Sequence, residues 1–200
     1  MSNQLANKLA RIISTIFVPP SFTIIIFTLF AFILETESLK ITITILVAYI
    51  FGFTAQIILF IFFRRKGKIV DLDASVKEER TTPFIISVGF YLIGLIILII
   101  FKVHIISIAL WFCYISNTLV TILINKHWKI SAHAMGASGP LAAVAYVFGP
   151  IALFFSLLVF LVGWSRIHLK VHNIAQVSAG ILLAFTSTFL QIFVIVNWIN

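Results

Sequence analysis

Five apolar stretches, each close to the length of a membrane-spanning helix, dominate the sequence and restrict the folds open to it. A helix that crosses about 30 Å of hydrocarbon needs roughly 20 residues. The stretches are residues 12–34, 41–63, 84–101, 105–124 and 177–196. Because 62% of the 200 residues are apolar, against roughly 45–50% in a soluble domain, we exclude a water-soluble monomer. We predict an all-α polytopic membrane protein with one transmembrane helical domain over residues 1–200.

A further apolar region, residues 132–164, is too long to be one crossing. A continuous helix over it would measure about 50 Å, well beyond the hydrocarbon core. Gly149 and Pro150 lie near its middle, and they signal a turn because proline cannot continue the helical hydrogen-bond ladder. We therefore predict two short crossings there, which makes a bundle of six to seven transmembrane helices. Pro19 and Pro20 are expected to bend or delay the first helix.

Three polar clusters interrupt the apolar sequence, at residues 71–84, 125–136 and 163–180. Two predicted crossings separate each cluster from the next, so all three are expected on the same face of the membrane. Of the 14 Lys and Arg residues, all but Lys40 and Lys102 fall on this face. This bias predicts a cytoplasmic face. In so apolar a chain, the net charge of +8 favours anionic lipid or substrate over nucleic acid.

The third cluster contains Arg166, His172 and Gln176. In a helix, His172 and Gln176 lie one turn apart on one face, where a side-chain amide can fix the tautomer of an imidazole. Arg166 is expected to face headgroups or an aqueous pocket, because burying it in lipid costs roughly 2.5–3.5 kcal/mol. The alternative is a plain cytoplasmic loop. His168 and His172 have a spacing compatible with metal ligation, but no third ligand is local, so we predict no metal site.

The first two clusters add further candidates for anion binding. Ser131 and His133 lie where a helix is expected to begin, and a helix N-terminus offers free N–H groups to a phosphate. Lys77 and Arg80 are one turn apart if helical, so both could point at one anion. Each of these residues also has a structural interpretation, as a packing group or part of a solvated loop. Their combination on one face is what indicates a site.

Taken in order, the three clusters resemble the motifs of the type 2 phosphatidic acid phosphatase superfamily, the integral-membrane lipid phosphatases that share a site with vanadium haloperoxidases. The third motif of that family reads S-R-x5-H-x3-D. Ser165, Arg166, His172 and Gln176 stand in this register, and only the last position differs. The resemblance covers residues 71–180, and within the superfamily the sequence is similar to a divergent prokaryotic subgroup.

The other two family motifs are matched less closely. The second, Pro-Ser-Gly-His, corresponds to residues 130–133, with Ile for Pro and Ala for Gly. The first, a Lys followed by Arg-Pro, corresponds to Lys77, Arg80 and Pro83 at altered spacing. The resemblance implies a prokaryotic cell membrane as the location. It also implies a lipid phosphate or diphosphate as substrate, such as a polyprenyl diphosphate or a phosphatidate-like lipid, and no cofactor.

The resemblance also implies roles for individual residues. His172 would attack phosphorus to form a phosphohistidine that water hydrolyses, and His133 would be the general acid for the leaving group. The groups that would hold the phosphoryl oxygens are Lys77, Arg80, Ser131 and Arg166. Such transfer needs positioning and positive charge, which Arg and Lys supply without a metal. Gln176 replaces a carboxylate; it can accept the imidazole N–H but carries no charge, so modest activity is expected.

Two other functions stay open at this point. Asp71 and Asp73, near Arg80, would suit a magnesium-dependent aromatic prenyltransferase, although that class usually needs two Asp-rich loops and this chain has one. A lipid-phosphate binder or transporter without catalysis would keep the anion pocket, with the chemistry lost through Ala132 and Gln176.

Overall fold

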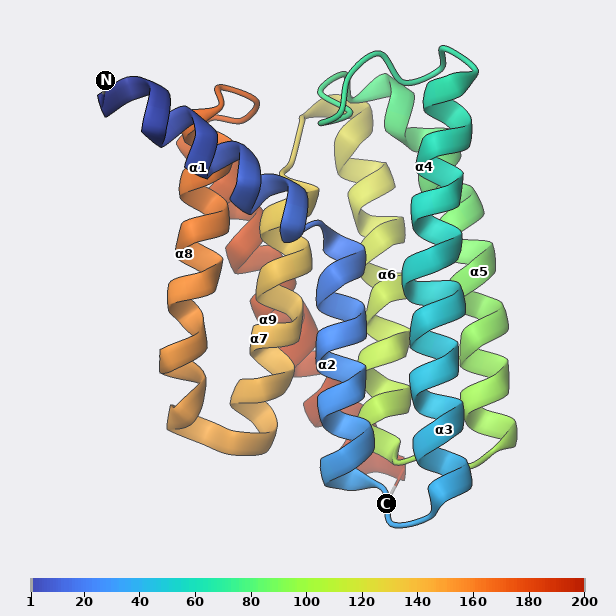
Figure 1. The fold of residues 1–200 in the computed structure, drawn as a ribbon. Helices are drawn as coiled ribbons and strands as arrows, with labels where there is room; N and C mark the ends of the chain where they lie inside the picture. The colour runs from blue at the N-terminus through green and yellow to red at the C-terminus, as the bar shows by residue number, and fades with distance from the viewer. Residues whose placement is uncertain (1, 200) are drawn as a thin grey trace.

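The computed structural model describes residues 2–199, and over this range the chain is built from helices without a β-strand. The α-helices are α1 (Ser2–Ile16), α2 (Pro19–Leu34), α3 (Ser38–Val47), α4 (Ala55–Arg65), α5 (Thr81–Ile100), α6 (Ile105–His127), α7 (Ala132–Phe148), α8 (Ala152–His168) and α9 (Ile174–Ile199). Short helical segments join some of them: the π-helical η1 (Ala48–Thr54) and the 3-10 turns η2 (Glu78–Arg80) and η3 (Gly149–Ile151). Figure 1 shows α2 to α9 running side by side, with α1 inclined across one end.

Five segments in the described part of the chain are long and apolar enough to cross a membrane. They are Ser38–Arg65, Glu78–Ile100, Ile105–His127, Ala132–His168 and Ile174–Trp198. The pair α1 and α2 forms a further, bent segment whose two helices meet at 57°. The fold is therefore that of an all-α polytopic membrane protein, as predicted.

The two prolines near the N-terminus begin a helix instead of interrupting one. Pro19 and Pro20 occupy the first positions of α2, where backbone N–H groups have no intrahelical acceptor and proline is well tolerated. The predicted bend is confirmed. The predicted start of the first crossing at residue 12 is wrong, because residues 12–16 belong to α1, which leans away by 57°.

The long region after Ala132 folds back on itself. Gly149 ends α7 with φ at 61°, in the left-handed region that glycine adopts without a Cβ clash. Pro150 lies next to it in η3, and α7 and α8 pack against each other as an antiparallel hairpin (Figure 1). The predicted turn is confirmed. Counting α3, η1 and α4 as one rod, the bundle has the expected six to seven helices.

Helix α1 lies across the end of the bundle and packs against α8 (Figure 1). One of its sides buries Ser14, while Leu5, Leu9, Ile12 and Ile16 are exposed on another. This spacing is that of an amphipathic helix. A helix of this kind, attached to a transmembrane bundle, is typical of one that lies in the plane of the membrane interface.

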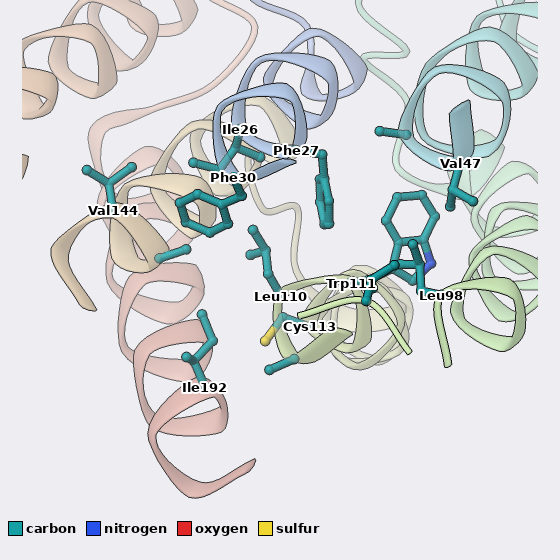
Figure 2. Packing of buried hydrophobic residues seen from close by; sticks show 14 of the residues in the cluster. Ile26, Phe27, Phe30, Val47, Leu98, Leu110, Trp111, Cys113, Val144 and Ile192 are labelled. Carbon is teal, nitrogen blue, oxygen red and sulfur yellow. The ribbon is translucent and has the colours of Figure 1, made fainter. Parts of the chain in front are cut away.

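The main apolar core lies in the half of the bundle away from the polar clusters. Figure 2 shows its buried side chains from close by. Trp111 of α6 is fully buried, meets Phe27 of α2 edge-on at 5.1 Å between ring centroids, and donates from Nε1 to the Tyr91 carbonyl at 2.7 Å. Gly94 of α5 makes room for the indole, since a Cβ there would overlap the ring. This packing holds α2, α5 and α6 together at one end and leaves space between them at the other.

All three polar clusters lie at one end of the bundle, as predicted from the even number of crossings between them. They comprise the loop between α4 and α5, the junction of α6 and α7, and the junction of α8 and α9 (Figure 1). The candidate site forms where these junctions meet.

Candidate functional site

Hydrogen bonds tie the three polar clusters together. Arg80, from the first cluster, donates from Nη1 to the Ile130 carbonyl in the second at 3.1 Å. Lys129, in the second, donates from Nζ to the Val171 carbonyl in the third at 2.6 Å. The convergence expected from the sequence is therefore made by direct contacts between segments far apart along the chain.

A cavity of about 270 Å³ opens at this convergence and continues into the bundle. Its polar end is lined by Asp73, Arg80, His133 and His172. Its inner part reaches Thr188, which lies about 21 Å along α9 from the start of that helix at about 1.5 Å per residue. Many of the other walls are apolar, with hydroxyl and amide groups from α5, α6 and α9 among them. The cavity thus connects a charged end to the apolar interior.

His172 lies in the loop before α9, not on its face, so the helical register predicted for His172 and Gln176 is wrong. The two nevertheless meet, with Nδ1 of His172 at 3.2 Å from Oε1 of Gln176. The backbone N–H of Asn173 donates to the same oxygen at 3.2 Å. This second bond identifies the amide oxygen, so Nδ1 must carry the imidazole hydrogen. The Nε2 lone pair is then free.

The surroundings of His172 favour the neutral imidazole. The side chain is 5% exposed. Burial, together with the charges of Arg80, Lys129 and Arg166, lowers the pKa of His172 to about 3, and the hydrogen bond that the imidazole donates to Gln176 opposes this only in part. His172 is therefore an uncharged base with an available nitrogen at neutral pH.

Arg166, in the last turn of α8, is completely buried. Its Nη1 donates to Oδ1 of Asp73 at 2.6 Å and also to the hydroxyl of Ser14. Within the described residues, Nε and Nη2 of Arg166 have no hydrogen-bond partner. Two buried N–H groups on one side of a guanidinium are costly to leave unpaired, and they form the edge that binds a carboxylate or phosphate with two parallel bonds.

Asp73 binds a second arginine in addition to Arg166. Nη1 of Arg11 in α1 lies 2.8 Å from Oδ2 of Asp73. Burial would raise the pKa of the Asp73 carboxyl, but the hydrogen bonds and charges of the two arginines outweigh it and hold that pKa below its usual range. Asp73 is therefore an ionised carboxylate with both oxygens engaged.

Arg80 is buried at the polar end of the cavity. It follows the loop that carries Asp73, and its Nε donates to the Ala74 carbonyl at 2.6 Å. With the bond to Ile130, this fixes the guanidinium between the first two clusters. The structure therefore brings Arg80 to the cavity, as the sequence predicted.

Ser131 and His133 lie at the start of α7, where a helix was expected to begin. The Ser131 hydroxyl accepts from the Ala134 N–H at 3.3 Å as the N-cap, and its backbone N–H donates to the Gln176 carbonyl at 3.3 Å. His133 lines the cavity, whereas Ser131 lies behind it. The structure thus brings His133 to the same cavity as His172 and gives Ser131 a capping contact.

Lys77 does not line the cavity with Arg80. Its Nζ donates to the carbonyls of Asn125 and Lys126 at 3.1 and 3.0 Å and pairs with Glu78 at 3.1 Å. It thereby satisfies carbonyls at the end of α6. Lys77 and Arg80 therefore reach different places: Lys77 binds the end of α6, whereas Arg80 binds the carbonyls of Ala74 and Ile130.

Lys129 is a cation that sequence reasoning missed. It lies close enough to His172 to depress its pKa, and burial with the charges of Arg80 and Arg166 lowers the pKa of Lys129 itself. The available signal was its position two residues before the Ser131 cap, next to the predicted N-terminus of a helix.

His168 faces α1 and not the cavity. Its Nε2 lies 2.9 Å from Oδ1 of Asn7, and its ring stacks on Trp164 at 5.1 Å. In the part of the chain that the structure describes, no group of at least three His, Cys, Asp or Glu side chains is placed to hold a metal ion. Asp71 accepts from the backbone N–H groups of Asp73 and Ser75, so it shapes its own loop.

The fold and this charged cavity define an integral membrane protein with a candidate anion site at one end of its helical bundle. Comparison of the chain with protein-family models found no match, and comparisons with curated proteins and with solved structures found none either.

Proposed function

We propose that the protein is a membrane phosphatase that hydrolyses a lipid phosphate or diphosphate through a phosphohistidine on His172. The observation that carries the proposal is the pair of unpartnered N–H groups on buried Arg166, whose partner Asp73 lines the same cavity as His133 and His172. An oxyanion held in this cavity would supply the partner that those N–H groups lack. This combination fits a phosphoryl-transfer site better than a plain cytoplasmic loop.

The proposed reaction has two steps. The Nε2 lone pair of His172 attacks phosphorus, the bond from phosphorus to the leaving oxygen breaks, and His133 protonates that oxygen. Water then attacks the phosphohistidine while His133 takes up a proton from that water, which releases phosphate and restores the starting state, a protonated His133 and a neutral His172. His133 thus serves as acid and then as base, as general acid–base catalysis in two opposed steps requires.

Positive charge would stabilise the phosphoryl group during transfer. Arg166 and Arg80 are buried near His172, and Lys129 adds a third cation there. Guanidinium groups fixed in advance and shielded from water stabilise charge on equatorial oxygens more strongly than solvent does. Lys129 is therefore a better candidate than Lys77 for the lysine of this group, and Ser131 would act through the start of α7.

The inner part of the cavity suits a lipid tail. Pro19 and Pro20 of α2 and Ile57 and Phe60 of α4 line it. α2 packs against α3 and η1 but makes few contacts with α4. A tail can therefore pass between α2 and α4 while the phosphate stays at the charged end, which supports a substrate held in the bilayer, such as a polyprenyl diphosphate or a phosphatidate-like lipid.

Of the two alternatives, the prenyltransferase fits less well. Both oxygens of Asp73 are bound to arginines, and Asp71 accepts from its own loop, so neither aspartate presents a free carboxylate for magnesium. A binder or transporter of lipid phosphates is favoured by one observation: Gln176, which orients His172, brings no negative charge to an imidazole that must become positive.

Phosphate release from a polyprenyl diphosphate by the purified protein in detergent tests these functions. We expect release that persists in EDTA and is lost in His172→Ala, while Glu78→Gln, an exposed acid paired with Lys77, retains it. Release that requires magnesium would support the prenyltransferase class, and binding without release would support the binder.

A further inference from the structure

We propose that Asp73 is a positioning residue that holds Arg166 with its free edge turned toward the bound phosphoryl group. The inference rests on the proposed function for its catalytic meaning, but its first test requires only anion binding. Nη1 of Arg166 forms an ion pair with Oδ1 of Asp73 at 2.6 Å.

The guanidinium needs such a partner because none of it is exposed. Arg166 has 0% and Asp73 9% of the side chain accessible. A buried charge without a counter-charge is strongly destabilising, and an arginine in that state would turn toward water or other acceptors. Asp73 removes this tendency by compensating the charge inside the protein.

The contacts divide the guanidinium into two sides. Nη1 is held by Asp73 and by the Ser14 hydroxyl, whereas Nε and Nη2 have no partner within residues 2–199. The planar group has a fixed fork geometry, so anchoring Nη1 also sets the direction of the Nε–Nη2 edge. This is the edge that binds two oxygens of a phosphate side by side.

Asp73 is itself held from two directions. Arg11 of α1 binds Oδ2, and Asp71 accepts from the Asp73 backbone N–H at 2.8 Å. Ser14 also belongs to α1. Helix α1, the loop before η2 and the end of α8 thus combine to orient one arginine, which gives α1 a role in the site that its sequence did not suggest.

Asp73 is also the acidic side chain among the described residues that line the cavity. Removing its charge would, by electrostatics alone, strengthen the binding of an anion. Loss of positioning has the opposite effect. Without Asp73 the Arg166 side chain must first be ordered before it can make two bonds to the phosphate, and this conformational cost weakens binding. The sign of the change therefore separates a positioning carboxylate from one that merely competes with phosphate.

The test measures how tightly the full-length protein in detergent binds inorganic phosphate. Bound phosphate stabilises the folded protein, so the readout is the phosphate concentration that gives half of the maximal stabilisation. We expect Asp73→Ala to weaken binding about tenfold, the loss of one good charge-assisted bond, and Asp73→Glu to recover most of it. Ser14→Ala, which alters no charge and acts from a different element, is expected to weaken binding by about threefold. Glu78→Gln removes an acid that does not contact Arg166 and is expected to bind as the wild type does.

Binding in Asp73→Ala that is unchanged or tighter than in the wild type overturns the proposal, as does a wild type that binds no phosphate. If Asp73→Ala does not fold, Ser14→Ala and Asp73→Glu decide by the same measure. Hydrolysis separates this inference from the proposed function. A wild type that binds phosphate in the expected pattern but hydrolyses no lipid phosphate leaves the positioning role intact and removes the phosphatase. A wild type that hydrolyses a lipid phosphate, together with an Asp73→Ala variant that binds phosphate normally, supports the phosphatase and removes the positioning role.

Discussion

The imidazole Nδ1 of His172 lies 3.2 Å from the amide oxygen of Gln176, and the Asn173 N–H holds that oxygen in place. The amide therefore performs the orienting half of a carboxylate's role without its charge. We predict that Gln176→Asp keeps kcat or raises it, while Gln176→Leu lowers kcat by at least about tenfold, because the wrong tautomer then competes. Steady-state phosphate release checks both. Complete loss of activity in Gln176→Asp would contradict this role.

Lys129 and Lys77 are the two candidates for the lysine that adds positive charge to the phosphate site. Lys129 lies beside His172 and supports the loop that carries it through the Val171 carbonyl, whereas Lys77 binds carbonyls at the end of α6. We expect Lys129→Gln to lower kcat/KM by about tenfold or more and Lys77→Gln to lower it by less than about threefold. Kinetics on the two matched variants decide between them, and a reversed order would favour Lys77 as the ligand.

Stability should fall on mild acidification because of His172. The pKa of His172 is about 3 in the folded protein and about 6.5 in the unfolded chain. Between these two pH values the imidazole is protonated in the unfolded chain and neutral in the folded protein. The contribution of neutral His172 is complete above pH 6.5 and is lost progressively as pH falls toward 3, by up to about 1.4 kcal/mol per pH unit. Melting temperatures in detergent from pH 7.5 to 4.5 should decline less steeply in His172→Gln; parallel declines would contradict the burial of a neutral imidazole.

The inner cavity should select for tail length. Gly139 lines it, and a Cβ there would meet Thr188 Oγ1 only at 3.4 Å, so a larger side chain has room to enter. We predict that Gly139→Leu lowers kcat/KM for a long-chain lipid phosphate by about tenfold and that for a short-chain analogue by much less. Gly89→Leu, at an exposed position of α5, is the control. Equal losses on both substrates would argue against a tail in this cavity.

The site end of the bundle is proposed to face the cytoplasm, from the bias in Lys and Arg. Cys113 is buried and is the single cysteine of the chain, so a cysteine introduced at Lys126 can be labelled selectively. A membrane-impermeant maleimide should modify it only after the cells are opened. Labelling in intact cells would place the site outside.

The bundle and the convergence of the clusters were predictable because both follow from simple rules. Apolar length sets the crossings, the pair Gly149 and Pro150 sets the turn, and parity sets which junctions share a face. The start of the first crossing was missed because a proline pair reads equally well as a bend within a helix or as the beginning of one, and here Pro19 begins α2.

The finer contacts of the site were not predictable, because they join residues that no local pattern connects. Asp73 and Arg166 are 93 positions apart. Lys77 and Lys129 both lie in polar segments, and only packing decides which amine reaches His172. Even the contact between His172 and Gln176, which has helical spacing, is made by a capping loop instead of a helix face.

A phosphohistidine at position 172 is the intermediate on which the proposed reaction depends, and trapping it is the most direct test. Wild-type protein, mixed briefly with a lipid diphosphate labelled in its terminal phosphate and then quenched in alkali, should retain acid-labile label on the peptide that contains His172. His133→Ala should retain label longer if it still reacts, since His133 is proposed to activate water, and Glu78→Gln should behave as the wild type does. Phosphate release without labelled His172, or label that survives in His172→Ala, would contradict the account.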